Sequence, residues 1–189
     1  MAGNFSKQGI EIEADQLLAG LKDALAGKPS AISAEETQKA MMQLQQEMEQ
    51  KFQANAGKQG EANKKQGQEF LAANKNKAGV QTLPSGMQYE ILNEGTGKTP
   101  TRTDNVTTHY EGTLIDGKVF DSSYERGQPA TFPVNGVIAG WTQALMMMKE
   151  GAKWRLFIPS DLAYGAQGAG ADIGPNATLI FDVELLKVN

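Results

Sequence analysis

Six aromatic residues stand beside or near turn signals between positions 110 and 181 of this 189-residue chain, and none has an obvious nucleophile next to it. The chain contains no cysteine and a single histidine. Chemistry that depends on shape and desolvation in an apolar pocket, without a proton relay or a metal, is therefore the leading interpretation. The six residues are Tyr110, Phe120, Phe132, Trp141, Tyr164 and Phe181.

The composition of the chain disfavours the other common kinds of site. His109 lies inside a predicted strand beside Tyr110, so a Ser-His-Asp hydrolase is disfavoured. The carboxylates have no recognisable ligand spacing, and we expect neither a metal site nor a cofactor. The glycine-rich segment 165–170 lacks the Lys-Ser/Thr ending of a phosphate-binding loop, and we interpret it as a flexible surface loop.

Three residues have the local setting of pocket groups. Trp141 begins a short predicted helix, from which its ring would point into the concave face of a sheet. Tyr164 precedes a glycine, which would leave its hydroxyl free at the mouth of a loop. Asp121 lies five residues before Arg126, close enough to pair with it and remain ionised at a pocket edge. Each also has a structural interpretation, because tryptophan is often core and aspartate often begins a turn.

The N-terminal half predicts two helices. Apolar residues at three- and four-residue steps indicate a helix over residues 14–25, which ends at Gly27. The capping box that begins at Ser33 starts a second helix, which runs without proline to about residue 73. Residues 53–69 are polar and contain three glycines, so we expect a solvated arm that does not anchor to a core. The alternatives are that the first segment folds back on the second domain or forms a disordered tail.

From Val80 onward the pattern changes to period two and predicts strands. Asp116-Gly117 is a strong hairpin signal, and one short helix is predicted between Trp141 and Met148. The elements favour an α+β fold in which an antiparallel sheet wraps around that helix, preceded by an all-α arm with one long helix. Two domains follow, residues 1–79 and 80–189. The strands are expected over residues 87–91, 106–115, 119–121, 130–134, 153–159 and 178–187.

Charge and hydropathy limit the partners and the compartment. The net charge of −4 is contributed by the second half, which disfavours nucleic acid and anionic membrane surfaces as partners. No segment approaches the ~20 apolar residues that a membrane span needs. The absence of cysteine fits either a reducing cytosol or a periplasm. The first residues lack a secretion signal, so we expect either a cytoplasmic protein or an envelope protein whose signal has been removed.

Several motifs in residues 80–189 occur together in one known family. They lie at residues 109–114, 116–123, 137–141, 158–159, 162–165 and 177–186. With these motifs the segment resembles an FKBP-type peptidyl-prolyl cis-trans isomerase. Residues 4–10 and 83–86 more loosely resemble the dimerisation arm of bacterial FKBPs of the macrophage infectivity potentiator (Mip) type.

The resemblance implies an enzyme that isomerises Xaa-Pro bonds in unfolded or partly folded polypeptides and binds tacrolimus and rapamycin. Trp141 would form the pocket floor, Tyr164 would donate a hydrogen bond to a substrate carbonyl, and Asp121 would sit at the rim. The barrier of ~20 kcal/mol arises from amide resonance, so a dry pocket that favours the twisted amide lowers it without a covalent step. The other expected contacts are Phe120, Tyr110, Phe132, Val137, Ile138 with its backbone N–H as a second donor, Ile173 and Phe181.

The same resemblance implies a homodimer formed through residues 5–52. Relatives of the Mip type carry a further helix before the position of Asn4, which this sequence lacks, so we expect weakened dimerisation. Ala130 stands where the family often has a second aromatic residue, which would widen one wall of the pocket. The alternative function is a dimeric holdase or a proline-peptide binding module in which catalysis is secondary.

Overall fold

The computed structural model describes residues 14–28 and 32–189, which belong to two compact units, residues 1–55 and 56–189. The boundary between the units falls inside a helix, α3, so the expected domain boundary at residue 79 lies within the second unit. The motif at residues 4–10 and the first part of the expected dimerisation segment, residues 5–13, lie outside the described residues.

Local capping signals define the two helices that begin in the first unit. α2 spans Ala14–Leu25 and is followed by Gly27, whose φ of 68° lies in the left-handed region that favours glycine. α3 spans Ala34–Asn74 and begins with the predicted capping box. Ser33 N–H donates to Glu36 Oε2 at 2.8 Å, and Glu36 N–H donates to Ser33 Oγ at 3.2 Å. The hydrogen bonds from Ser33 lower the pKa of Glu36.

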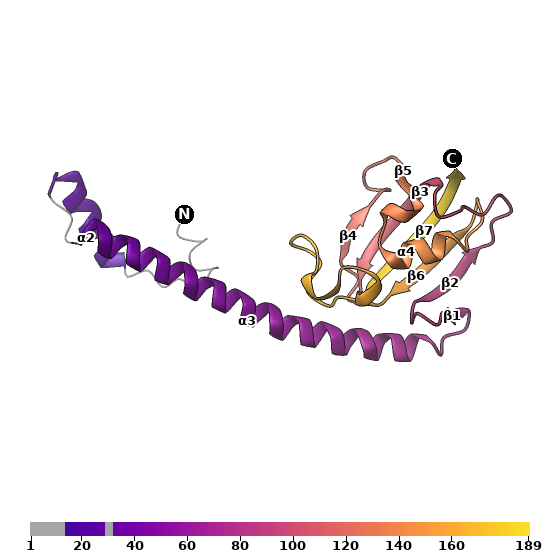
Figure 1. Cartoon of the computed structure of the whole chain (residues 1–189), viewed down its shortest axis with the longest axis horizontal. Helices are drawn as coiled ribbons and strands as arrows, with labels where there is room; N and C mark the ends of the chain where they lie inside the picture. Colours follow the sequence, from indigo (N-terminus) through magenta and orange to yellow (C-terminus); the bar gives the residue numbers. More distant parts are fainter. Residues whose placement is uncertain (1–13, 29–31) are drawn as a thin grey trace. The chain divides into compact units, whose positions relative to one another are not determined.

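Seven strands of the second unit form one antiparallel sheet in the order β1-β2-β6-β7-β3-β4, and β5 also pairs with β3 (Figure 1). The predicted hairpin at Asp116-Gly117 joins β3 to β4, with Gly117 at a φ of 87°. The expected fold class is therefore confirmed. The strands are β1 (Val80–Thr82), β2 (Gln88–Asn93), β3 (Asn105–Leu114), β4 (Val119–Ser122), β5 (Ala130–Pro133), β6 (Lys153–Ile158) and β7 (Leu179–Val188).

One edge of β3 is shared by two short strands, with a gap between them at Tyr110. β5 pairs with the first half of β3 and β4 with its last residues. In the gap, Ser123 N–H donates to Tyr110 O at 2.9 Å, and Tyr110 N–H donates to Ser123 Oγ at 2.7 Å. The segment between β4 and β5 is therefore attached to the sheet at the position that carries Tyr110.

The inner face of the sheet is covered by α4 (Ala139–Leu145), which begins two residues before the expected position (Figure 1). Gly140 allows close packing, because a Cβ at this position would lie 2.6 Å from Ile158 Cγ2. Trp141, Ala144 and Leu145 point into the core between the helix and the sheet. Three short 3₁₀ turns complete the unit: η1 (Val134–Gly136), η2 (Ser160–Leu162) and η3 (Gly165–Gln167).

The last turns of α3 belong to the second unit and pack against the rest of it. Positions that are buried or half-buried recur at three- and four-residue steps, which places them on one helix face. An added Cβ on Gly67 would lie 2.2 Å from Thr178 Oγ1, so the helix backbone approaches this residue closely. The expectation that residues 53–69 have no anchor is therefore wrong, because glycine provides contact here by its small size. The packed face consists of Ala56, Gly60, Asn63, Gly67, Phe70, Leu71 and Asn74.

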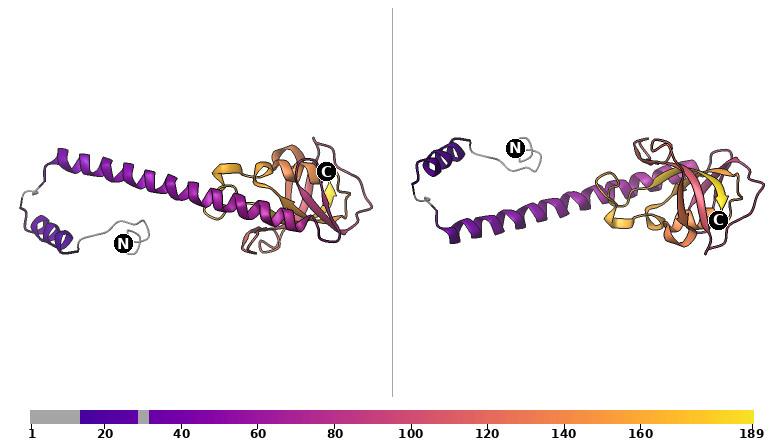
Figure 2. Two further views of the ribbon diagram at one scale, coloured as in Figure 1. Left: turned by 90° about the horizontal axis from the view of Figure 1, so that it is seen from below. Right: turned by 90° about the horizontal axis from the view of Figure 1, so that it is seen from above.

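The final turn of α3 lies on the outer face of the sheet. The rings of Phe70 and Phe157 have their centroids 5.9 Å apart. Asn74 Nδ2 donates to Gln88 Oε1 at 2.9 Å. Because neighbouring strand residues point to opposite faces and Ile158 faces α4, Phe157 faces away from it. The last turns of α3 and the helix α4 therefore lie on opposite faces of the sheet (Figure 2).

Candidate active site

A cavity of about 310 Å³ opens between α4 and the inner face of the sheet. Its volume lies at the lower end of the range for small-molecule sites. A larger hollow of about 490 Å³ on the outer face is lined mainly by charged and polar side chains, so the smaller cavity suits apolar chemistry better. The cavity is lined by Tyr110, Asp121, Phe132, Gly136, Val137, Ile138, Trp141, Tyr164 and Phe181.

Trp141 forms the floor of this cavity. Its indole is surrounded by the rings of Tyr110, Phe132 and Phe181, with centroids at 5.2, 5.9 and 5.3 Å. The planes of these rings stand at 87°, 85° and 84° to the indole, an edge-to-face geometry that favours aromatic packing. Because α4 holds Trp141 from one side and strands carry the other rings, the floor and walls are set by packed elements.

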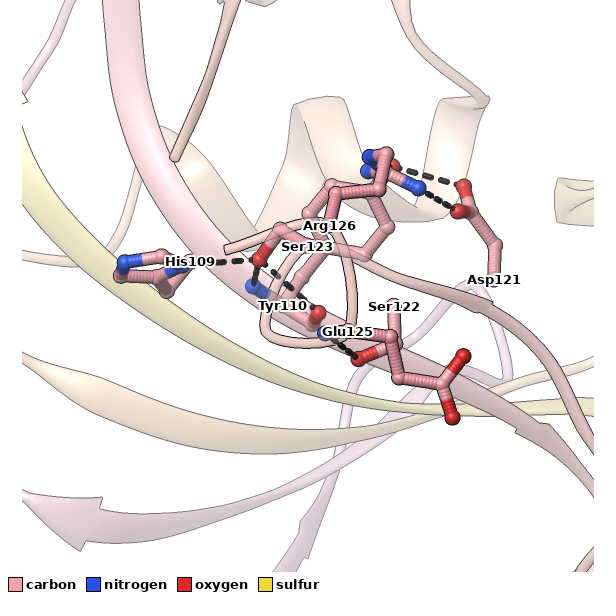
Figure 3. Close-up of polar contacts among 7 residues, drawn as sticks. All are labelled: His109, Tyr110, Asp121, Ser122, Ser123, Glu125 and Arg126. Carbon is pink, nitrogen blue, oxygen red and sulfur yellow. Dashed lines mark hydrogen bonds and ion pairs between the residues drawn. The ribbon is translucent and has the colours of Figure 1, made fainter. Parts of the chain in front are cut away.

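Three side chains form a closed hydrogen-bonded ring at the rim (Figure 3). Tyr110 OH donates to Asp121 Oδ2 at 2.6 Å, and Arg126 Nη2 donates to Tyr110 OH at 2.7 Å. Arg126 Nη1 forms an ion pair with Asp121 Oδ1, which confirms the pairing expected from their spacing. Burial raises the pKa of Asp121, but the hydrogen bonds from Tyr110 and Arg126 outweigh it and lower that pKa overall. Burial and the bond to Asp121 raise the pKa of Tyr110, so at neutral pH the carboxylate is charged and the phenol neutral.

A serine and a histidine also meet near the rim, a pair that the sequence did not indicate. Ser123 Oγ lies 2.9 Å from His109 Nδ1 (Figure 3). The same oxygen donates to Tyr110 O at 3.1 Å and accepts from Tyr110 N–H, and Ser123 is fully buried. His109 stacks on Tyr124 with centroids 4.7 Å apart. With its proton committed and its oxygen inaccessible, Ser123 anchors the loop and cannot act as a nucleophile.

Several hydrogen-bond donors at the cavity have no partner within the described part of the chain, among them the buried indole Nε1 of Trp141. The hydroxyl of Tyr164 makes no hydrogen bond there, and this residue is 40% exposed. The backbone N–H of Ile138, at the N-terminal end of α4, likewise has no acceptor among the described residues. An apolar cavity with free hydrogen-bond donors and no free nucleophile is suited to holding a carbonyl-containing ligand.

Comparison with known proteins agrees with this chemistry. The family model of the FKBP-type peptidyl-prolyl cis-trans isomerase matches residues 96–186, and a model of the domain amino-terminal to such isomerases matches residues 1–91. Outer membrane protein MIP of Legionella longbeachae is 46% identical over 185 residues, which cover 98% of this chain and 79% of the relative. The chain belongs to the FKBP-type peptidyl-prolyl isomerase family.

Two further relatives also match nearly the whole chain of this isomerase. The FKBP-type 22 kDa peptidyl-prolyl cis-trans isomerase of Escherichia coli is 46% identical over 189 residues, covering 97% of this chain and 88% of the relative. The crystal structure of FkpA from Escherichia coli superimposes with a TM-score of 0.82 at 41% identity, covering 99% of this chain and 87% of that one. Relatives of this kind are peptidyl-prolyl isomerases, and so is this protein.

Two residues expected to contact substrate do not line the cavity. Phe120 stands edge-on to Phe181 at 5.5 Å and packs over Gly112, where an added Cβ would lie 2.6 Å from its ring. Ile173 is 8% exposed and joins the core, while its backbone pairs with Ala169. Ala130 is also absent from the lining, since it packs against the core in β5.

Gly136 also lines the cavity, although its residue type did not predict it. A Cβ at this position would lie 2.6 Å from Pro133 Cγ, so the turn of η1 needs glycine. The one sequence signal that could have predicted Gly136 as a cavity residue is its place between a proline and the Val137-Ile138 motif. Gly136 has no side chain that could suggest chemistry.

Proposed function

We propose that the 310 Å³ cavity is the isomerase site and that the proline ring of the substrate lies on the Trp141 floor. The walls of Tyr110, Phe132 and Phe181 exclude water from the amide that precedes the proline. Twisting that amide removes its resonance and much of its charge separation, so an apolar environment favours the twisted form. The observation that carries the proposal is the indole floor enclosed by three perpendicular rings.

We assign two of the free donors to substrate carbonyl oxygens. Tyr164 OH and Ile138 N–H would bind and orient the peptide without losing a hydrogen bond within the protein. Asp121 is charged and accepts bonds from both Tyr110 and Arg126, so its proposed role is to hold the Tyr110 wall in place. An ionised carboxylate of lowered pKa is a poor proton donor, and no proton transfer is needed.

A protease-coupled assay on an Xaa-Pro peptide tests the assignment. Tyr164→Phe is expected to lower kcat/KM about 2- to 10-fold, the equivalent of one net hydrogen bond of ~0.5–1.5 kcal/mol. Tyr124→Phe is the matched control, because that hydroxyl bonds Glu184 on the outer face of the sheet. Trp141→Ala is expected to remove most of the activity, and rapamycin is expected to inhibit competitively. Full activity in both Tyr164→Phe and Trp141→Ala would refute the site.

Dimerisation through the first unit is the proposed role of its apolar surface. The described part of this unit leaves large apolar side chains exposed on both helices, from 38% at Leu44 to 80% at Leu25. Exposed large apolar side chains, where they lie next to one another, are typical of protein interfaces. Sedimentation equilibrium should show a concentration-dependent dimer that Leu21→Glu prevents, and a monomer at all concentrations would refute it. The residues are Leu17, Leu18, Leu21, Leu25, Met41, Met42, Leu44 and Phe52.

The same surface supports a second candidate function, a holdase that binds folding clients. Proline-containing unfolded polypeptides would then contact the first unit as well as the isomerase cavity. Suppression of citrate synthase aggregation should persist in Trp141→Ala and fall when the exposed leucines of α2 are changed to serine. Loss of suppression in Trp141→Ala alone would place client binding in the cavity and refute this candidate.

The cell envelope is the proposed compartment. One relative is named an outer membrane protein. The helices that the structure describes include none that is both long and apolar enough for a membrane crossing. Fractionation of the source cells should find the protein in the envelope fraction, and recovery in the cytoplasm alone would refute the assignment.

A further inference from the structure

The segment that carries Tyr164 is a long loop, residues 163–178, which lies between η2 and β7. Its first leg contains Tyr164, and its second leg, residues 174–178, leads into β7. The loop is tied across itself, because Asn176 N–H donates to Gly165 O at 2.8 Å. Gly165 directly follows Tyr164, so the position of the second leg determines where the Tyr164 backbone is held on its C-terminal side.

The second leg rests on α3. Asn63 Nδ2 donates to Pro175 O at 2.8 Å, and Asn176 Nδ2 donates to Gly60 O at 3.3 Å. The two amides therefore bond in opposite directions across the same contact. An added Cβ on Gly174 would lie 3.0 Å from the side-chain amide nitrogens of Asn63 and Gln59, so the loop backbone packs directly against side chains of the helix.

Asn176 has a backbone conformation that is unusual for its residue type. Its φ is 54°, and it is the one non-glycine residue with positive φ among those the structure describes. Asparagine tolerates this region better than most residues, and the conformation persists where surrounding contacts hold it. Here those contacts are Gly60 O on the helix and Gly165 O on the first leg.

We propose that Asn63 and Asn176 are positioning residues that hold Tyr164 at the isomerase cavity through the contact between α3 and the loop. This inference rests on the function proposed for Tyr164. On its N-terminal side Tyr164 follows η2, but its ring makes no hydrogen bond within the described residues and is substantially exposed. Loosening the second leg frees the Tyr164 hydroxyl to move, and substrate binding then has to order it.

A double-mutant cycle in the full chain tests the inference. Asn63→Ala removes the bond to Pro175 O, and Asn176→Gly removes the amide while keeping positive φ accessible. Each should lower kcat/KM about 2- to 10-fold, mainly through a higher KM. In the Tyr164→Phe background the same changes should have less than a 2-fold further effect, because sites that act through one group are not additive. Gln68→Ala, an exposed amide on the same helix, is the matched control and should have no effect.

Fluorine NMR of the protein labelled with 3-fluorotyrosine reports the position of Tyr164 without reference to catalysis. The chain has four tyrosines, and the Tyr164 resonance is the one missing from Tyr164→Phe. Asn63→Ala should shift or narrow that resonance and leave the other three unchanged. An unchanged Tyr164 resonance, or losses of activity that add fully to that of Tyr164→Phe, would overturn the positioning role. If the Tyr164→Phe variant is fully active, but the Tyr164 resonance of the otherwise unchanged protein responds to Asn63→Ala, the positioning role stands and the proposed function of Tyr164 fails.

Discussion

Gly57, Gly60 and Gly67 lie on one helix, α3, in three different packing environments. A Cβ added at Gly57 would meet nothing within 4 Å. At Gly60 it would lie 3.2 Å from Asn176 Nδ2 and Pro175 Cβ, and at Gly67 it would lie 2.2 Å from Thr178 Oγ1. Replacing each glycine by alanine therefore makes the same chemical change against an increasing steric cost.

Two opposing free-energy terms decide the outcome of these substitutions. Alanine is favoured over glycine inside a helix by about 1 kcal/mol, so Gly57→Ala should raise the free energy of unfolding by about that amount. Overpacking a close contact costs about 1–3 kcal/mol. Because the helix-propensity term is common to both variants, Gly67→Ala should be about 1–3 kcal/mol less stable than Gly57→Ala. Gly60→Ala should fall between them.

Urea unfolding followed by tryptophan fluorescence measures this difference, because Trp141 and Trp154 both lie in the second unit. Thr178→Ala should restore part of the stability in the Gly67→Ala background, since it removes the oxygen nearest the new Cβ. Equal changes in Gly57→Ala and Gly67→Ala, of either sign or zero, would refute the docking of α3. That result would also remove the physical basis for the proposal that the contact between α3 and the loop positions Tyr164.

Three further predictions follow from the same contacts. A chain that begins at residue 56 keeps the whole second unit and should unfold as that unit does in the full chain. A chain that begins at residue 80 should lose about 2–4 kcal/mol of unfolding free energy, because Phe157 then loses the Phe70 ring. Calorimetry of both chains measures the difference, and equal stabilities would contradict the prediction. Asp121 has a lowered pKa, so its contribution to stability is present above its unfolded value of ~3.9 and is lost as pH falls through the lower folded value. Urea midpoints of Asp121→Asn should therefore converge with the parent only at acidic pH, and a constant difference down to pH 2 would contradict this. Burial and the bond to Glu184 raise the pKa of Tyr124 to about 12. The free energy of unfolding should therefore fall as pH rises from ~10 through that value, and it should fall less in Tyr124→Phe. A phenolate absorbance titration at 295 nm that shows no late-titrating tyrosine would refute this prediction.

Features set by neighbouring residues could be predicted from the sequence. The capping box at Ser33 and the turn at Gly117 depend on contacts within a few positions, and both occur as expected. The pairing of Asp121 with Arg126 is equally local, since the two residues are separated by one turn. The alternation of strand residues likewise placed β3 and β6 to within one residue at each end.

A site built from distant segments could be predicted from the sequence only in part. Eight of the residues selected from the sequence line the cavity, because the family motifs preserve their order along the chain. Phe120 and Ile173 do not line it, because neighbouring packing on Phe181 and within the core decides where each side chain lies. The bond between His109 and Ser123 joins β3 to a loop fourteen residues away, and no local pattern indicates it.

The polar part of α3 shows most clearly where local reasoning ends. From its composition, residues 53–69 favour a helix, and three glycines predict fraying because each lowers helix propensity. Folding brings Thr178 against Gly67, where an added Cβ would collide, and Pro175 against Gly60, where an added Cβ would make a tight contact. The effect of a glycine depends on what faces it: a glycine that faces solvent weakens a helix, and a glycine that faces a neighbouring segment allows close contact. Composition sets the first property, and the arrangement of the chain in space sets the second.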